Sequence, residues 1–203
     1  MIKIYGSPRS SAGRCYLMLE ECGLKYEHVK LDMGKKEHKS VDYLKINPNG
    51  KVPALTDGEL QIWESIAINN YLAEKYKPEL LGHGPEAKGL VYQWSVWAMT
   101  EMQSPFVDIL IQLHFVPEEK RNHDKIEKAK MHIPELLNIL DKALSNKKYL
   151  VNDTYSLADL NIASVLNIGS SIGIHFDQFQ NITNWFSQIK NRPAWQKFVE
   201  ARN

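Results

Sequence analysis

Two adjacent serines near the N-terminus carry the side chains best placed to do chemistry. Ser10 and Ser11 follow the apolar run 2–5 and the turn residues 6–8, and they precede a helix-forming segment. Ligands of α/β sheets bind beyond the carboxyl ends of strands, where a helix N-terminus offers free N–H groups and partial positive charge. A hydroxyl at this point can donate a hydrogen bond to a bound anion. The alternative is that either serine only caps the helix.

A second candidate lies at Val52-Pro53, just before the apolar run 54–56. Proline cannot donate a ladder hydrogen bond, so it belongs at the start or edge of a strand. A cis bond would present the N–H and C=O of Val52 to a ligand. The residues alone favour trans, since cis accounts for roughly 5–6% of X–Pro bonds. Main-chain binding at Val52 therefore stays one of two alternatives at this point.

A third candidate is Glu64-Ser65, which opens the helical pattern 65–76. Ser65 can cap the helix, whose N-terminus can hold a carboxylate, and Glu64 can pair with an ammonium group. The alternative is an ordinary capped helix with a glutamate on the surface. Each of these pairs has an ordinary structural explanation when it is considered alone.

Other motifs support no chemistry. The segment 169–173 has the GxSxG pattern of hydrolases, but it follows a helix, and only His175 comes later in the chain to serve as a base. The chain has no GxGxxG or Walker loop for nucleotides and no metal-ligand spacing, so we expect no metal. Cys15 and Cys22 form no CxxC pair, which disfavours a dithiol oxidoreductase.

Composition narrows the class of protein. The chain has 203 residues, of which 43% are hydrophobic, and a net charge of +1. Such a balance disfavours nucleic-acid binding driven by phosphate contacts. No apolar run approaches the roughly 18 residues needed to span a membrane, and we see no secretory signal or disulfide framework. The expected location is a reducing cytoplasm.

The elements that must position these residues change character near the middle of the chain. Strands are predicted at 2–5 and 26–31, joined by a helix over 11–22 that makes a right-handed parallel crossover. A short helix over 40–45 precedes an antiparallel hairpin over 54–56 and 59–62, whose Asp57-Gly58 turn is the strongest hairpin signal. A helix over 65–76 and a linker at 77–88 follow. The fold class is an α/β domain over residues 1–78 and an all-α domain over residues 86–203.

The second half shows only helical periodicity. Pro105 and Pro134 fall inside predicted helices and should kink or break them. The segment Ser156–Asp159 is a capping box that opens an apolar, and therefore central, helix. We favour a purely structural role for that box.

The ordered set of motifs resembles the glutathione transferase family, most closely its serine-dependent theta-, phi- or zeta-like branches. The resemblance covers almost the whole chain. It rests on Tyr5-Gly6-Ser7-Pro8-Arg9-Ser10 with Arg14, Asn47-Pro48-Asn49-Gly50-Lys51-Val52-Pro53-Ala54-Leu55, Asp57-Gly58, Glu64-Ser65-Ile66-Ala67-Ile68 and the capping box Ser156–Asp159. It implies a thioredoxin-like N-terminal domain that binds glutathione and a helical domain that lines the site of an electrophile. It also implies detoxification chemistry in a homodimer.

The resemblance also implies roles for individual residues. Ser10 would hydrogen-bond the glutathione sulfur, with Ser11 as the second choice and Tyr5 as a lesser one. The remaining roles concern the rest of the tripeptide. Val52, before a cis Pro53, would pair with its cysteine; Glu64 and Ser65 would hold its γ-glutamyl end; His38 and Lys39 would reach its glycine carboxylate; Lys51 stands where the family pattern often has glutamine. Arg14 could turn toward the site, but a surface or domain-interface salt bridge is favoured for it.

The function that this resemblance implies is transfer of the glutathione thiolate to a small hydrophobic electrophile, with glutathione as co-substrate. Two alternatives remain at this stage. One is a binding or interaction protein that keeps the fold without catalysis, and the other is a zeta-like glutathione-dependent isomerase or dehalogenase. Candidate walls of the electrophile pocket lie in the helical half: Trp97, Met102, Phe106, Ile109 and His114. An apolar stripe at this spacing is more often core than pocket.

Overall fold

The computed structural model describes residues 1–202, which form two compact units. One unit comprises residues 1–81 together with the segment that begins at Lys190, and the other comprises residues 82–189. The predicted boundary between 78 and 86 lies at this division. The C-terminal segment, expected in the helical domain, belongs instead to the N-terminal unit, because its last helix packs on the first helix of the chain.

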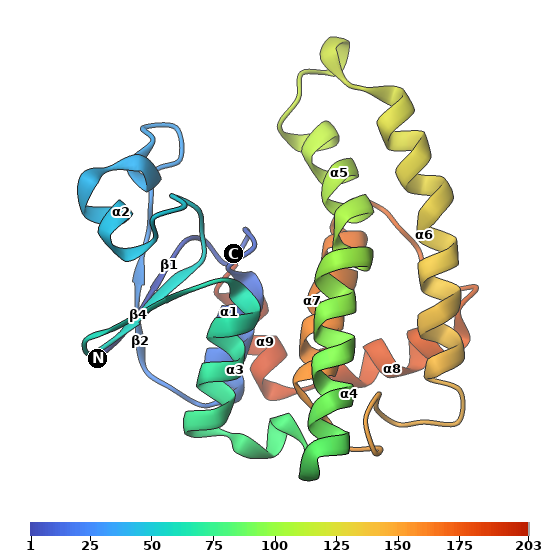
Figure 1. Ribbon diagram of the computed structural model, residues 1–203. Helices are drawn as coiled ribbons and strands as arrows, with labels where there is room; N and C mark the ends of the chain where they lie inside the picture. Colours follow the sequence, from blue (N-terminus) through green and yellow to red (C-terminus); the bar gives the residue numbers. More distant parts are fainter. Residues whose placement is uncertain (203) are drawn as a thin grey trace. The chain divides into compact units, whose positions relative to one another are not determined.

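The N-terminal unit is a four-stranded sheet with helices, as the sequence predicted (Figure 1). Its elements are β1 (Ile2–Tyr5), α1 (Gly13–Glu21), β2 (Tyr26–Val29), the 3-10 turn η1 (Glu37–Lys39), α2 (Val41–Ile46), β3 (Ala54–Asp57), β4 (Leu60–Trp63), α3 (Ser65–Tyr76), the 3-10 turn η2 (Pro78–Leu81) and, at the C-terminal end, α9 (Pro193–Glu200). The strand order is β2-β1-β3-β4. The β1–β2 pair is parallel, whereas β1–β3 and β3–β4 are antiparallel, so the predicted crossover and hairpin are both confirmed.

Packing in this unit follows from the apolar pattern of its elements. Helices α1 and α3 lie side by side (Figure 1), and α9 packs on α1. The buried faces of β1 and β3 include Ile4 and Leu55, which are fully buried and oppose each other in the ladder. This core holds the carboxyl end of β1 and the beginning of α1 in fixed positions, and the two serines lie between them.

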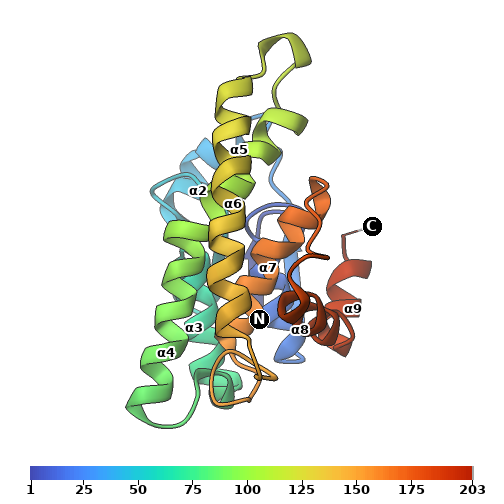
Figure 2. The same cartoon turned by 90° about the vertical axis from the view of Figure 1, so that its right-hand side faces the viewer.

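The second unit is built from helices. They are α4 (Gly84–Trp97), a π-helical turn (Ala98–Met102), α5 (Gln103–His114), the 3-10 turn η4 (Glu118–Lys120), α6 (His123–Ala143), α7 (Leu157–Ser171) and α8 (Gln180–Lys190). Helices α5 and α6 run side by side (Figures 1 and 2). Every residue from Leu157 to Leu166 is buried, which confirms that the helix after the capping box is central. None of the helices in residues 1–202 is long and apolar enough to cross a membrane.

The two predicted helix-disrupting prolines behave differently. Pro105 lacks the N–H that would bond to the Glu101 carbonyl, and the helix adopts the π-helical turn Ala98–Met102 just before it. Pro134 lies inside the continuous helix α6, so a break at this position is wrong. Pro134 and Lys130, whose carbonyl loses its partner, are both exposed, and water can satisfy that carbonyl.

Candidate active site

The turn after β1 holds Ser10 through its own main chain. Ser10 Oγ accepts the N–H groups of Ser7 and Ala12 at 3.3 and 3.2 Å, and it donates to the Ser7 carbonyl at 2.7 Å. The same carbonyl also accepts the Ser10 N–H at 2.9 Å, so it keeps a partner if the hydroxyl turns away. The two N–H groups occupy both acceptor positions of the Ser10 oxygen, so any further hydrogen bond that Ser10 makes must use its single proton as donor. Such a hydroxyl is well prepared to serve an incoming anion.

Ser11 lies beside Val52. Its Oγ donates to the Val52 carbonyl at 2.8 Å, and the Val52–Pro53 peptide bond is cis, as the family resemblance implied and against the preference of the residues alone. Gly6 permits this close approach, because its φ is +117° and a Cβ there would lie 3.0 Å from the Val52 Cβ. The structure therefore brings the serine turn and the Val52–Pro53 turn together.

The main chain before Val52 is held by two residues that sequence reasoning missed. The Tyr43 hydroxyl and Asn47 Nδ2 both donate to the Lys51 carbonyl at 2.6 Å. Burial raises the pKa of Tyr43 to about 12, so its hydroxyl remains a donor at neutral pH. Asn47 had a signal in its Asn-Pro-Asn-Gly turn, whereas nothing in the sequence marked Tyr43.

His38 and Lys39 lie against the Gly50 turn. Lys39 Nζ donates to the Asn49 carbonyl at 3.0 Å, and a Cβ on Gly50, whose φ is +56°, would lie 2.8 Å from the His38 carbonyl oxygen. His38 Nδ1 is buried and has no hydrogen-bond partner within residues 1–202. The exposed side chain of Lys51 follows directly, so the structure gathers these three basic residues at one edge of the site.

Glu64 has an unusual backbone at the start of α3. Its φ is 71° and its ψ is 120°, a conformation rare for residues other than glycine and concentrated at ligand sites. The Glu64 side chain is exposed and makes no cap hydrogen bond. Helix α3 begins at Ser65, and Glu64 is its N-cap. The expectation that Ser65 caps this helix is therefore wrong.

Ser65 instead receives a hydrogen bond from Arg14. Arg14 Nη1 donates to Ser65 Oγ at 2.8 Å, across 51 positions of sequence. Arg14 is 5% exposed, and burial lowers its pKa to about 10, so the guanidinium stays charged at neutral pH. A position at the surface, one of the two placements favoured for this residue, is therefore wrong. Arg14 fixes the first residue of α3 relative to α1.

The two cysteines are poorly suited to act as nucleophiles. Burial raises the pKa of Cys15 to about 12, only partly offset by Arg14, and burial raises the pKa of Cys22 to about 11. Both thiols are free and protonated at neutral pH. The Tyr5 ring packs against the Tyr43 ring with centroids 5.7 Å apart. No group of three or more metal-ligating side chains occurs within residues 1–202.

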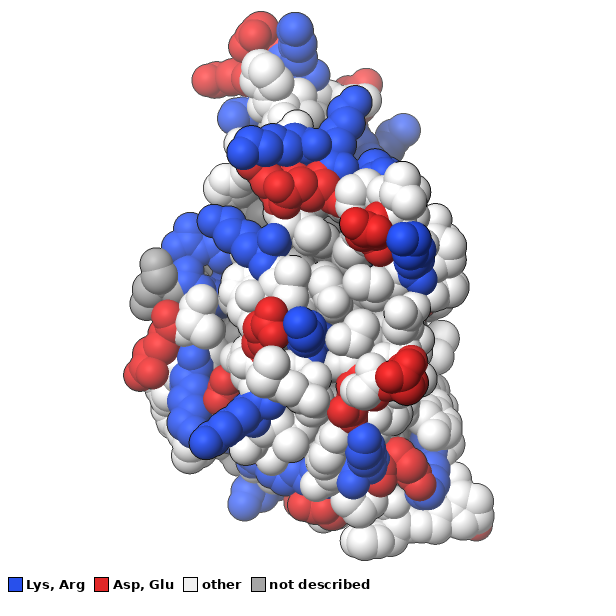
Figure 3. Space-filling model, turned by 90° about the vertical axis from the view of Figure 1, so that its left-hand side faces the viewer, with Lys and Arg blue, Asp and Glu red and all other residues white. Residues whose placement is uncertain are grey.

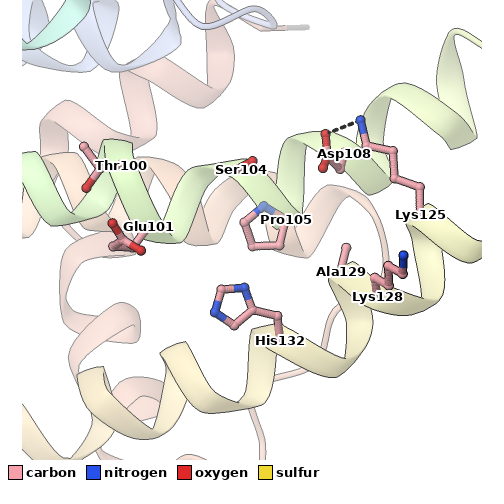
Figure 4. A pocket seen from close by; sticks show the side chains of 9 residues that line it. All are labelled: Thr100, Glu101, Ser104, Pro105, Asp108, Lys125, Lys128, Ala129 and His132. Atoms are coloured by element: carbon pink, nitrogen blue, oxygen red, sulfur yellow. Dashed lines mark ion pairs between the residues drawn. The ribbon is translucent and has the colours of Figure 1, made fainter.

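A separate hollow of about 400 Å³ lies in the helical unit, between α5 with its preceding π-helical turn and α6 (Figure 4). Asp108 and Lys125 face each other across it and form an ion pair at 2.9 Å. Glu101 on one side and His132 on the other also point into the hollow (Figure 4). Charged side chains of both signs therefore line this hollow together with Pro105 and Ala129.

Three of the five candidate walls of the electrophile pocket are buried. Met102, Phe106 and Ile109 are at most 2% exposed. A Cβ on Gly169 would lie 2.6 Å from the Phe106 ring, which places Phe106 in the core against α7. His114 is exposed and Trp97 is partly exposed. The apolar stripe is therefore mainly core, the more frequent outcome for such spacing.

Comparison with known proteins identifies the family. The model of the glutathione S-transferase N-terminal domain matches residues 1–74, and that of the C-terminal domain matches residues 104–193. The chain belongs to the glutathione S-transferase family. The rice (Oryza sativa subsp. japonica) protein named "Probable glutathione S-transferase GSTF2" is 36% identical over 207 residues, which cover 97% of this chain and 94% of the relative. Glutathione S-transferase F9 of Arabidopsis thaliana is 32% identical, covering 98% and 96%.

Solved structures of glutathione S-transferases share the same fold. Glutathione S-transferase I bound to lactoylglutathione superposes with a TM-score of 0.91 at 33% identity, covering 98% of this chain and 99% of that one. The maize enzyme with an atrazine–glutathione conjugate also has a TM-score of 0.91, at 33% identity and with 99% and 97% coverage. The thioredoxin-like fold of the N-terminal unit is thereby shown for this glutathione S-transferase.

Proposed function

We propose that this glutathione transferase uses the Ser10 hydroxyl to hold glutathione as a thiolate, which then attacks an electrophilic carbon. A sulfur–carbon bond forms, and the leaving group departs with the electron pair of the bond that breaks. The observation that carries this proposal is the environment of Ser10 Oγ. Two main-chain N–H groups donate to this oxygen. When the Ser10 hydroxyl rotates away from the Ser7 carbonyl, its proton is therefore available to donate to a bound sulfur.

The energetics of a single hydroxyl are adequate for this task. A free thiol has a pKa near 8.5 and is only a few per cent thiolate at neutral pH. Lowering that pKa by about two units needs roughly 2.7 kcal/mol. One hydrogen bond to a charged acceptor contributes about 1.5–3 kcal/mol, and the N-terminus of α1 adds about 0.3–1 kcal/mol. Ser10 supplies the larger part of the required stabilisation.

The hydrogen bonds of the two serines support Ser10 over Ser11. When the Ser10 hydroxyl turns to a sulfur, the Ser7 carbonyl keeps the Ser10 N–H at 2.9 Å. When the Ser11 hydroxyl turns away, the Val52 carbonyl gives up the 2.8 Å bond that joins the two turns. Ser11 therefore supports the site by holding Val52, while Ser10 is the donor to sulfur.

The remaining residues of the site account for the ends of the tripeptide. The main chain of Val52 would pair with the cysteine of glutathione. Glu64, with its free carboxylate, would take the γ-glutamyl ammonium group, and Ser65 the adjacent carboxylate. The basic residues gathered at the Gly50 turn would take the glycine carboxylate: His38, Lys39 and Lys51. The transferases I of known structure bind lactoylglutathione and an atrazine–glutathione conjugate, which supports a similar ligand here.

A pair of matched variants tests the role of Ser10. Turnover of a chromogenic aryl halide with glutathione is measured in the parent, in Ser10→Ala and in Ser11→Ala, together with the ultraviolet absorbance of bound thiolate. Loss of about 1.5–3 kcal/mol predicts a fall in kcat of about 10- to 160-fold for Ser10→Ala. We expect Ser11→Ala to keep the thiolate absorbance. Equal kcat and equal absorbance in Ser10→Ala and the parent would exclude Ser10 from the mechanism.

The protein is further proposed to act in the cytoplasm as a homodimer. Two free cysteines, one of them buried, suit a reducing compartment, and the family resemblance supports the dimer. Light scattering after size exclusion should give twice the chain mass of 23.4 kDa. A particle of single-chain mass across the micromolar range would contradict the dimer.

A further inference from the structure

The peptide group that links Gly6 to Ser7 connects the catalytic turn to two residues that no functional role explains. Its carbonyl oxygen, on Gly6, lies 2.9 Å from the Tyr16 hydroxyl and 2.7 Å from His28 Nε2. Its N–H, on Ser7, donates to Ser10 Oγ at 3.3 Å. One planar peptide unit therefore has two side-chain donors at one end and the Ser10 oxygen at the other.

We propose that Tyr16 and His28 are positioning residues for Ser10, acting through the Gly6–Ser7 peptide group. This inference rests on the proposed role of Ser10. The two donors fix the plane of the peptide, and so fix the direction of the Ser7 N–H toward Ser10 Oγ. Hydrogen bonds to the carbonyl also polarise the amide, which strengthens its N–H as a donor by about 10–30% per bond. A stronger donation to Oγ makes the Ser10 proton a better donor to sulfur.

The geometry fixes the direction of each hydrogen bond. A carbonyl oxygen only accepts, so both Tyr16 and His28 must donate to it. Tyr16 is 1% exposed, and burial raises the pKa of its hydroxyl well above the ordinary value, so it remains a donor throughout the working range. His28 donates through Nε2 whether its ring is neutral or protonated. The support for the peptide group therefore persists across neutral pH.

Packing holds the two donors in place. The rings of Tyr16 and His28 meet edge to face with centroids 5.4 Å apart, and the Tyr26 ring also packs edge to face with Tyr16 at 5.6 Å. The Tyr26 hydroxyl donates to Glu20 at 2.7 Å and so does not touch the Gly6 carbonyl. Gly6 N–H donates to the Val29 carbonyl at 3.3 Å, which anchors the same residue to β2.

The test compares Tyr16→Phe, His28→Leu and their combination with two controls. Tyr26→Phe removes a hydroxyl from the same aromatic cluster without touching the peptide, and His28→Gln keeps an N–H donor of similar reach. The measurements are the pKa of bound glutathione from thiolate absorbance against pH, together with kcat and KM for glutathione. Circular dichroism establishes that each variant is folded.

We expect each single variant to raise the pKa of bound glutathione and lower kcat about threefold, and the double variant to lower kcat about tenfold. KM for glutathione should stay within about twofold, because the binding groups are intact. Tyr26→Phe and His28→Gln should match the parent. A folded double variant with the parental thiol pKa and kcat would overturn the inference, and so would an equal loss in Tyr26→Phe.

A double-mutant cycle separates positioning from a general structural effect. With Ser10 replaced by alanine, Tyr16→Phe should leave the pKa of bound glutathione unchanged, because the peptide N–H has no hydroxyl to act on. A further rise in that background would show that Tyr16 acts by another route. If Ser10→Ala alone leaves the thiol pKa at the parental value, the role of Ser10 fails, and the positioning role fails with it.

Discussion

Each unit of the molecule gathers several hydrogen-bond donors around one aspartate, and the two aspartates lie in opposite surroundings. In the N-terminal unit, Asp57 Oδ2 accepts from Lys75 at 2.6 Å and from two tyrosine hydroxyls at 2.7 Å. The hydroxyls belong to Tyr71 and Tyr76, whose rings also lie beneath the Lys75 ammonium group. A cation at the surface therefore balances this carboxylate.

The helical unit has no such cation at its carboxylate. Asp159 is fully buried and accepts from the Leu150 N–H, from the Trp185 Nε1–H and from the N–H and hydroxyl of Ser156, at 2.8–3.0 Å. All four donors are neutral. Burial raises the pKa of Asp159, whereas the hydrogen bond from Lys75 is the largest cause that lowers the pKa of Asp57.

The contrast between Asp57 and Asp159 shows that the surroundings of an aspartate, and not its residue type, decide how its charge affects stability. The Lys75 side chain, which pairs with Asp57, is 46% exposed, so this network is partly screened by water and salt. Figure 3 shows basic and acidic side chains interspersed over one face of the molecule. At Asp159 a network of neutral donors must compensate for lost hydration. We therefore expect the helical unit to depend on its aspartate more strongly.

The largest effect should follow Asp159→Ala. Truncation leaves buried donors on Leu150, Trp185 and Ser156 without an acceptor, and each such group costs about 1–3 kcal/mol. We expect the free energy of unfolding to fall by about 3–5 kcal/mol, measured by urea denaturation with Trp fluorescence. Asp159→Asn keeps one acceptor oxygen and should lose less. A loss below about 1 kcal/mol in Asp159→Ala would show that the donors find other partners.

A smaller effect should follow Asp57→Asn. The variant removes the charge that three donors share but keeps an oxygen acceptor, and the site lies near the surface, so we expect a loss of about 1–2 kcal/mol. Thermal melting by circular dichroism checks this. Asp42→Asn is the matched control, because Asp42 pairs with Lys45 at 2.9 Å while its side chain is 93% exposed. If the control loses as much stability as Asp57→Asn, the network has no special role.

The hydrogen-bond networks around Asp57 and Asp159 also show which parts of the fold the sequence could predict. Local spacing predicted the Asp57-Gly58 turn and the Ser156–Asp159 capping box, and both are present. The donors that complete each network come from distant positions. Tyr71, Lys75 and Tyr76 lie 14 to 19 residues from Asp57, and Trp185 lies 26 residues from Asp159. Such contacts depend on how helices pack, and one sequence carries no record of that.

The candidate site divides in the same way. Short ordered motifs predicted Ser10, Val52 and Glu64, because a turn, a strand start and a helix start each have a local signature. They did not predict the hydrogen bonds that hold these residues in place. Arg14 reaches Ser65 across 51 positions and His28 reaches Gly6 across 22. Sequence reasoning therefore identified candidate ligand-binding groups and did not predict the hydrogen bonds that hold them in place.

The smallest effects should appear as opposite slopes of stability against pH. The pKa of Asp57 is lowered below its ordinary value of 3.8, so the folded state stays ionised where the unfolded state already binds a proton. Its contribution is complete above about pH 5 and is lost as pH falls below about pH 4. The pKa of Asp159 is raised above the same value. There the folded state binds more protons, so stability increases as pH falls through the window just above about pH 4.

Urea denaturation of the parent, Asp57→Asn and Asp159→Asn from about pH 3 to about pH 7 separates the two slopes. The parent should lose its advantage over Asp57→Asn toward acid pH, because only the parent has a lowered carboxyl pKa at residue 57. Relative to Asp159→Asn, the parent should gain stability as pH falls from neutral toward about pH 4, because protonation removes a buried charge. A difference between the parent and Asp159→Asn that stays constant with pH would mean that the buried carboxylate is fully compensated by its four neutral donors. The networks of Asp57 and Asp159 would then differ only in how deeply each aspartate is buried.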